Sequence, residues 1–229
     1  MENLLAASKN DFQSVCVCMR HHRFTNVRGT ATVENSVSGG HYRSKLERDG
    51  FITWMLNPDV AQARLQKPRV KNPNSDGSWK RYTGDLLVDF HPKLQRRQLV
   101  IEFKYAKELA NLKKTEPKRH PEIAAHLDSQ KRDFLIQTEE HVYAAGFPMM
   151  RFVWDHRNKK MHPASQEIIA HVWANPGVSL GVMLGTLRIE RIARLELIPE
   201  VWRLVSTHHL SVDFKKVLDQ SAKLHPGSV

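Results

Sequence analysis

Two β-type segments separated by a short polar linker constrain the fold of this chain more than any other feature. The segments DLLVDF (residues 85–90) and QLVIEFK (residues 98–104) are rich in β-branched and apolar residues, and the linker HPKLQRR between them is polar and contains a proline. Residues of the first kind favour strands, and a polar linker with proline favours a turn. The pattern predicts an antiparallel hairpin.

Three charged residues are expected at one end of this hairpin. Asp85 opens the first strand, while Glu102 and Lys104 lie two positions apart on the second and therefore point to the same side of the sheet. Strand pairing brings Asp85 near Glu102, where a divalent cation can bridge them. Glu102 and Lys104 also interrupt an apolar run, in which ionised groups are costly unless paired or bound to a metal. The competing interpretation makes Asp85 a turn residue after Gly84 and the other two solvent-facing strand residues.

Hydrolysis of a phosphodiester is the chemistry that fits this cluster. The reaction needs a cation that neutralises the developing charge and lowers the pKa of the attacking water. Mg²⁺ prefers one or two carboxylates together with substrate oxygens, which Asp85 and Glu102 can supply. Lys104, a compact cation, is expected to orient the water or to stabilise the negative charge on the pentavalent phosphorane.

The charge balance favours a polyanionic partner. The chain carries 35 Lys and Arg against 24 Asp and Glu, a formal net charge of +11, and eleven basic residues face five acidic ones between positions 80 and 119. Such an excess suits nucleic acid. A membrane is the weaker interpretation, because no apolar run reaches the roughly 18 residues of a spanning helix. The residues expected to contact DNA are Arg43, Lys80, Arg81, Arg96, Arg97, Lys107, Lys113 and Lys114.

Glu47 has two interpretations that do not exclude each other. A helix is predicted from near Ser44, because apolar residues follow one helical stripe until Asn57 and Pro58 stop it. Ser44 and Glu47 have the spacing of a capping box at the start of that helix. Taken alone, the spacing favours the capping role, and a role as a further acidic site residue is what the family resemblance given below implies.

The remaining segments predict a mixed sheet covered by helices, followed by a smaller helical unit. We expect a short strand within residues 60–70, a turn-rich connection at 71–80, a helix over about 127–145 that Gly146 ends, and a strand at 148–155. Helices at 164–175, 177–187 and 198–209 with a strand at 210–214 suit a helix-turn-helix or winged-helix type module or a plain packing appendage. The expected domains are a basic arm (1–39), an α/β domain (40–162) and a small helical domain (163–229).

Cys16 and Cys18 are the only cysteines of the chain, which are too few for a disulfide framework and favour a reducing cytoplasm. Together with His21 and His22 they crowd into seven positions. Structural zinc sites usually separate their ligand pairs by about a dozen residues. We therefore expect an ordinary extended segment here and no zinc.

Four blocks carry a resemblance to a known family. They are YRSKLERDGFITWMLNPDVAQARLQ, RYTGDLLVDF, QLVIEFKYAKEL and GFPMMRFVWDHRNK, within about residues 40–160. In order and spacing they resemble the TnsA-like transposon-end endonucleases of the PD-(D/E)xK superfamily. Two departures, Gly84 before the aspartate and Tyr105 after the lysine, stand where proline is usual or frequent. The match implies a restriction-endonuclease-like fold and the catalytic set Glu47, Asp85, Glu102 and Lys104.

The resemblance also implies a cofactor and partners. Mg²⁺, with Mn²⁺ as a substitute, is expected on Asp85, Glu102 and the backbone carbonyl of Phe103, with Glu47 as an additional ligand. The implied function is that of a heteromeric transposase subunit, in a bacterial cytoplasm and on the nucleoid when active. It hydrolyses phosphodiester bonds at the 5′ ends of a transposon, beside a DDE-type partner transposase and an ATP-using regulator. The alternatives are a stand-alone restriction or repair nuclease of the same fold and a non-catalytic DNA-binding adaptor subunit.

Overall fold

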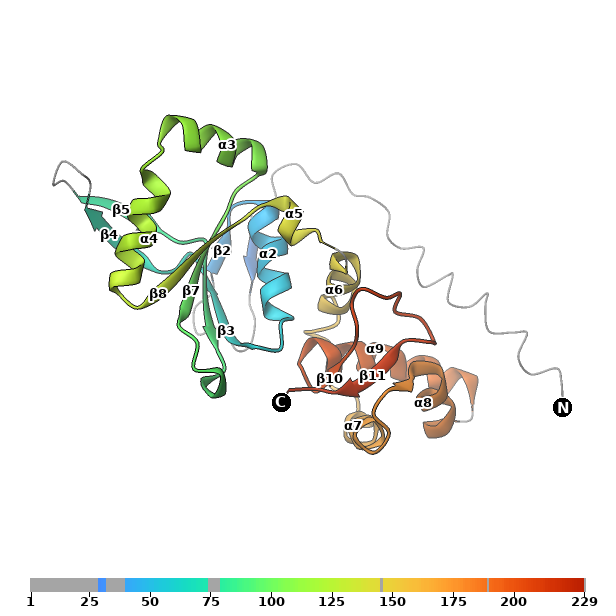
Figure 1. Ribbon diagram of the computed structural model, residues 1–229. Coiled ribbons are helices and arrows are strands. Elements are labelled where there is room, and N and C mark those ends of the chain that lie inside the picture. The colour runs from blue at the N-terminus through green and yellow to red at the C-terminus, as the bar shows by residue number, and fades with distance from the viewer. Residues whose placement is uncertain (1–28, 32–39, 74–78, 145, 189, 229) are drawn as a thin grey trace.

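A four-stranded mixed sheet organises the first half of the structure, a computed structural model that describes residues 29–31, 40–73, 79–144, 146–188 and 190–228 (Figure 1). The strand order is β3-β6-β7-β8, antiparallel in the first two pairs and parallel in the last. The strands are β3 (Val60–Leu65), β6 (Leu86–Phe90), β7 (Gln98–Phe103) and β8 (Arg132–Gln137). The predicted hairpin is confirmed as β6 and β7, with Leu86 paired to Ile101 and a short 3-10 turn, η1 (Pro92–Leu94), between them.

The alternation of side chains along the hairpin explains why helices cover both faces of the sheet. Leu86 and Ile101 pack on the face covered by α2 (Lys45–Met55), whereas Leu87 and Val100 pack on the face covered by α4 (Arg119–Ser129). Helices on both faces hide the otherwise exposed apolar side chains of a mixed sheet. The predicted α/β class with a mixed sheet flanked by helices is thereby confirmed.

The contact between α2 and β7 depends on a glycine. A Cβ atom at Gly50 would lie 2.2 Å from Phe103 Cε1, so the ring or the helix would have to move. Gly50 therefore lets α2 approach the end of β7 that carries the candidate site.

The predicted helix over 127–145 is wrong. The chain forms α4 up to Ser129, then β8, then α5 (Glu139–Val142), and α3 (Ala106–Thr115) precedes α4 in the same crossover. Leu127 and Phe134 lie on different elements, although their spacing fits one helix. Pairing of β8 along the full length of β7 decides the conformation, because parallel strands need a long crossover between them.

The predicted strand at 148–155 is also wrong. This segment forms α6 (Phe147–Trp154), and Gly146, with φ 103°, begins that helix and does not end the preceding one. Periodicity alone cannot separate a short buried strand from a short buried helix. A proline in the first helical turn is well tolerated, since its missing N–H has no partner there.

The last part of the chain forms a second core. The three predicted helices are confirmed, although the third begins earlier, at Arg191, and includes Pro199. Three short antiparallel strands in the order β10-β11-β9 accompany them. The elements are α7 (Ser165–Ala174), β9 (Val178–Ser179), α8 (Leu180–Leu187), α9 (Arg191–Ser206), β10 (Leu210–Ser211) and β11 (Lys223–Pro226). Val153 of α6 and Ile52 of α2 join this core, so the expected boundary at 162/163 stays a prediction.

Two ribbons lie outside the main sheet. One pairs β1 (Gly29–Ala31) with β2 (Gly40–Tyr42), and the other pairs β4 (Arg69–Pro73) with β5 (Trp79–Thr83). The predicted short strand is β3, and both ends of the predicted connection at 71–80 belong to the second ribbon. Most of the predicted arm, including Cys16, Cys18, His21 and His22, lies outside the described residues. No helix in the described part of the chain has the length and apolar character needed to span a membrane.

Candidate active site

The register of β6 on β7 brings Asp85 beside the end of β7. The Asp85 N–H donates to the Ile101 carbonyl at 3.1 Å, and its side-chain Oδ2 accepts from the Phe103 N–H at 2.8 Å. These two bonds fix the carboxylate of Asp85 next to the position of Glu102, as the hairpin pattern predicted. We call this end of the β6–β7 hairpin the carboxylate end.

Glu102 is nearly completely buried, and basic side chains lie around one of its two oxygens. Its Oε1 lies 3.5 Å from Lys104 Nζ, 3.7 Å from His120 Nε2 and 4.0 Å from a guanidinium nitrogen of Arg119. The other oxygen, Oε2, is buried without a hydrogen-bond partner among the described residues. Glu102 and Lys104 therefore share one side of the strand, as predicted, and a buried carboxylate oxygen is left to accept a further ligand.

Tyr82 of β5 is a further buried polar group at this end. Its hydroxyl faces the Glu102 carboxylate without a hydrogen bond of ordinary length among the described residues. Burial raises the pKa of Tyr82 above its ordinary value, and the negative charges of Glu102 and Asp85 raise it further. The phenol stays protonated beside the two carboxylates, so it can donate a hydrogen bond to them or to a bound oxygen.

Glu47 reaches the same region from α2 and also caps that helix. Its N–H donates to the Ser44 hydroxyl at 3.1 Å, which confirms the predicted N-cap. Its side chain does not return to Ser44, because Oε2 accepts from the Arg43 N–H at 3.0 Å and from the Gln66 amide at 3.1 Å. The carboxylate of Glu47 is therefore buried, hydrogen-bonded and turned toward the connection between β3 and β4.

The pKa of Asp85 reflects its burial and the negative charges near it. The pKa of Asp85 is raised to about 7. Burial is the largest cause and the charges of Glu47 and Glu102 add to it, while Lys104 and the Phe103 N–H oppose the shift. A carboxyl group with such a shift is a candidate for function, because a bound cation would relieve the repulsion.

Asp85 and Glu102 are the two expected carboxylate ligands that the hairpin brings to one end. The Phe103 carbonyl, the third expected ligand, accepts from Lys104 Nζ at 3.4 Å and so faces the same cluster. Within the described ranges, no three or more His, Cys, Asp or Glu side chains are arranged to hold a metal ion. The side chain of Glu47 is engaged by Arg43 and Gln66, so the donor set at hand is two carboxylates and a carbonyl, which suits Mg²⁺ with substrate oxygens completing its shell.

Two of the predicted DNA-contacting residues lie beside this cluster. Arg43 and Arg81, together with Arg69 and Lys71, line a hollow of about 450 Å³ between the β4–β5 ribbon and the start of α2. We call it the basic hollow. Among the described residues, none of these four side chains forms an ion pair.

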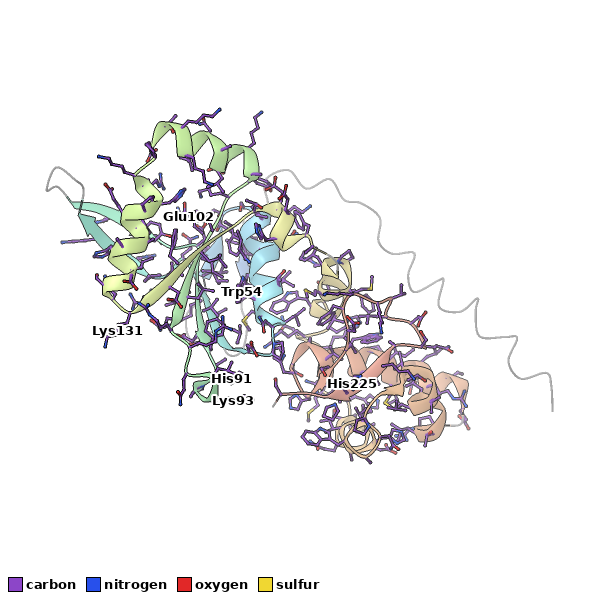
Figure 2. All side chains as sticks on the ribbon, in the orientation of Figure 1. Trp54, His91, Lys93, Glu102, Lys131 and His225 are labelled. Carbon is purple, nitrogen blue, oxygen red and sulfur yellow. The ribbon has the colours of Figure 1, made fainter. Side chains whose placement is uncertain are left out.

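Arg96 and Arg97 lie at the opposite end of the hairpin, which we call the turn end. Figure 2 shows Lys93 of the connecting turn and Glu102 at opposite ends of the strands. Arg97 pairs with Asp128 at 2.9 Å and with Asp133 at 3.3 Å. Arg96 lies 3.6 Å from Asp59 and over the ring of Phe90.

The other predicted DNA contacts do not line the basic hollow. Lys107, Lys113 and Lys114 are exposed on α3. Lys80 belongs to β5, and its side chain is outside the described part of the structure. The structure thus separates residues that the sequence grouped by their proximity along the chain.

Sequence reasoning missed Tyr82, His120, Arg119 and Gln66. Tyr82 stands three residues before Asp85, in the same block, and that closeness is a usable signal. His120 and Arg119 belong to the segment KRHPE, which the sequence pattern marked only as a break between secondary-structure elements. Only the packing of α4 on the sheet brings them to Glu102.

We find no match to this chain among protein-family models or among curated proteins. The function is therefore inferred from the site itself and from the resemblance described above.

Proposed function

We propose that this chain is a Mg²⁺-dependent DNA endonuclease, the TnsA-like subunit of a heteromeric transposase, which hydrolyses phosphodiester bonds at the 5′ ends of a transposon. One observation carries the chemistry. Asp85 and Glu102 lie at one end of a buried hairpin, with the ammonium of Lys104 beside Glu102, and the pKa of Asp85 is raised to about 7. A divalent cation between Asp85 and Glu102 would offset their negative charges, and the ammonium of Lys104 lies beside that position.

The roles follow from the contacts. Asp85, Glu102 and the Phe103 carbonyl would hold the ion, Glu47 would be an additional ligand after a change of rotamer, and Mn²⁺ would substitute for Mg²⁺. The bound ion supplies charge neutralisation at phosphorus and an acidified water. Lys104, whose ammonium already contacts Glu102 Oε1 and the Phe103 carbonyl, orients that water or stabilises the phosphorane. Tyr82, Arg119 and His120 lie beside the Glu102 carboxylate and can hold it in place.

The architecture supports the proposed restriction-endonuclease-like fold. Glu47 lies on the helix that precedes the catalytic strands, a position where many nucleases of this fold carry an acidic residue. The order α7, β9, α8, α9, β10, β11, with the sheet order β10-β11-β9, is compatible with a winged-helix-like second domain. Fold alone does not assign a reaction, so the site residues carry the chemical part of the proposal.

The transposon context rests on the resemblance of residues 40–160 to the TnsA-like endonucleases. It specifies double-stranded transposon ends as substrate, a DDE-type transposase that processes the 3′ ends, and an ATP-using regulator. The C-terminal domain is the proposed contact for those proteins. An unaided nuclease with a net charge of +11 would nick DNA without selectivity, because phosphate contacts carry no sequence information. Dependence on a partner avoids that damage.

The test incubates the full-length chain and Mg²⁺ with labelled transposon-end DNA, with and without the transposase encoded by the neighbouring gene, and maps breaks on each strand. Breaks at the 5′ ends that require the transposase, and that Glu102→Gln removes, support the proposal. Site-specific double-strand cutting by the chain alone would favour the restriction or repair alternative. DNA binding without divalent-dependent cleavage in either mixture would leave the adaptor alternative.

A further inference from the structure

Three of the four basic residues of the β4–β5 ribbon lie on one face. Val70 pairs with Tyr82, and both side chains contribute to the core on the α4 side of the sheet. Lys71 pairs with Arg81 in the next position, so their side chains project from the opposite face of the ribbon. Arg69, two residues before Lys71, projects from that same face.

The facing positive charges of Lys71 and Arg81 lower the stability of the ribbon when no anion is bound. Like charges directly opposite each other on paired strands are destabilising. Lys71 and Arg81 are such a pair, and within the described residues no carboxylate forms an ion pair with either of them. An anion in the basic hollow would remove this repulsion. Arg96 and Arg97, by contrast, already have carboxylate partners.

The basic hollow adjoins the carboxylate end directly. Gln66 lines the hollow, and its side-chain amide donates to Glu47 Oε2 at 3.1 Å. Its backbone N–H donates to the Asp85 carbonyl at 2.8 Å, and its φ is 54°. A left-handed conformation is strained for a residue other than glycine and persists where the surroundings impose it. Gln66 thus joins the hollow to the carboxylate of Glu47 and to the backbone of Asp85, so an anion held there lies beside the carboxylate end.

We propose that the basic hollow binds backbone phosphates of the DNA strand that flanks the bond to be cut, with Arg69, Lys71, Arg81 and Arg43 as its cations. The identity of the strand as substrate rests on the proposed function. The site itself rests on these four cations, which form no ion pair among the described residues. Figure 1 shows the β4–β5 ribbon and the helices α7 and α8 at opposite ends of the molecule, so DNA in the hollow leaves the C-terminal part free for a partner.

The experiment measures DNA affinity by fluorescence anisotropy over a range of NaCl concentrations, using full-length Glu102→Gln protein so that the labelled duplex stays intact. Arg69→Glu with Arg81→Glu should weaken binding at least about tenfold and lower the slope of log affinity against log salt by about 0.9 for each phosphate that the variant no longer neutralises. The matched double reversal, Arg96→Glu with Arg97→Glu, should leave the slope unchanged. Equal slopes for the two double variants overturn the proposal.

Lys71→Glu keeps the test decisive if the double reversal fails to fold. The substitution converts the repulsive pair with Arg81 into an attractive one, so the melting temperature should not fall. The salt slope should nevertheless decrease. A lower melting temperature together with an unchanged slope would make Lys71 a structural residue and contradict the proposal.

Two further arms separate the sources of phosphate and the two proposals. Inorganic phosphate at the same ionic strength should compete weakly with DNA. The contrary result is that phosphate raises the melting temperature of the wild type but not of Arg69→Glu with Arg81→Glu, while the two double variants have equal DNA salt slopes. In that case the hollow is a site for free phosphate and the DNA assignment is overturned. Cleavage assays with Glu102 restored report the proposed function separately. If the salt slopes differ but no cleavage occurs, the DNA site in the hollow stands and the nuclease proposal fails. If cleavage occurs but the salt slopes are equal, the nuclease proposal stands and the DNA site in the hollow fails.

Discussion

The two ends of the β6–β7 hairpin handle charge in opposite ways. At the turn end each arginine has a carboxylate partner, as in Arg97 with Asp128 and Arg96 with Asp59. At the carboxylate end like charges accumulate: Asp85 lies near Glu102 and Glu47, and the basic hollow beside them has cations without partners among the described residues. Lys104 and Arg119 lie near Glu102, but this pairing is incomplete, because Glu102 Oε2 has no hydrogen-bond partner among the described residues and the pKa of Asp85 is raised. Incomplete pairing leaves this end able to take an outside ligand. Proximity of basic residues along the sequence did not reveal this difference.

The largest expected effect follows from removing one charge at the carboxylate end. Glu102→Gln keeps the shape of the side chain and removes the ligand charge, so divalent-dependent cleavage should fall by at least about 100-fold, the magnitude usual for loss of one preorganised electrostatic group. Thermal unfolding and the salt dependence of DNA binding should stay near the wild-type values. A cleavage rate close to that of the wild type would show that the charge of Glu102 is not catalytic.

The next effect is a pH dependence that only the carboxylate end can produce. Asp85 keeps its proton up to about pH 7 in the folded protein, whereas the unfolded chain releases it near its ordinary value of 3.8. The folded state therefore binds more protons between those values, and its stability decreases as pH rises through this window, by up to about 1.4 kcal/mol per unit. Denaturant unfolding at several pH values without divalent ions measures this decrease.

Asp85→Asn is the matched control for that pH dependence. The variant has no proton to lose, so the component of the stability loss that belongs to Asp85 should disappear. Mg²⁺ should raise the melting temperature of the wild type more at pH 8 than at pH 6, since it binds the ionised carboxylates. The same stability profile in wild type and variant would remove Asp85 as the source.

A smaller effect is expected at the turn end, where charge is matched. Arg97→Ala breaks two partly exposed ion pairs and should lower the free energy of unfolding by no more than about 1 kcal/mol. Arg81→Ala, in the basic hollow, should cost no stability and should weaken DNA binding instead. Urea unfolding measures the stability of both variants, and fluorescence anisotropy measures their affinity for DNA. Loss of stability at Arg81 and of DNA binding at Arg97 would reverse the comparison.

The smallest effect is expected from Glu47→Gln. The charge of Glu47 raises the pKa of Asp85, so its removal should shift the stability decrease of Asp85 to lower pH. The fold should persist, because the glutamine can still accept from the Arg43 N–H and the Gln66 side chain. An unmoved pH midpoint would indicate that Glu47 acts only as part of the helix start.

Local patterns in the sequence predicted the hairpin, the start of α2 and three of the C-terminal helices. Each of these depends on interactions within a few residues: the strand-forming run before and after one linker, Ser44 as a cap, and Pro or Gly between helical segments. The same short range placed Asp85, Glu102 and Lys104 together, because the two strands that carry them are joined by a single turn.

Tertiary structure decided what local patterns left ambiguous. Residues 132–137 form a strand because β7 offers an edge to pair with, and residues 147–154 form a helix because α2 and α9 cover them. Long-range packing likewise brings His120 and Arg119 to Glu102 and Gln66 to Glu47. It also separates Arg97 from Arg81, which are close in the sequence. The sequence by itself determined which residues carry charge within an apolar hairpin. Only the fold decided which of those charges find partners, because pairing depends on distances between elements that no local pattern encodes.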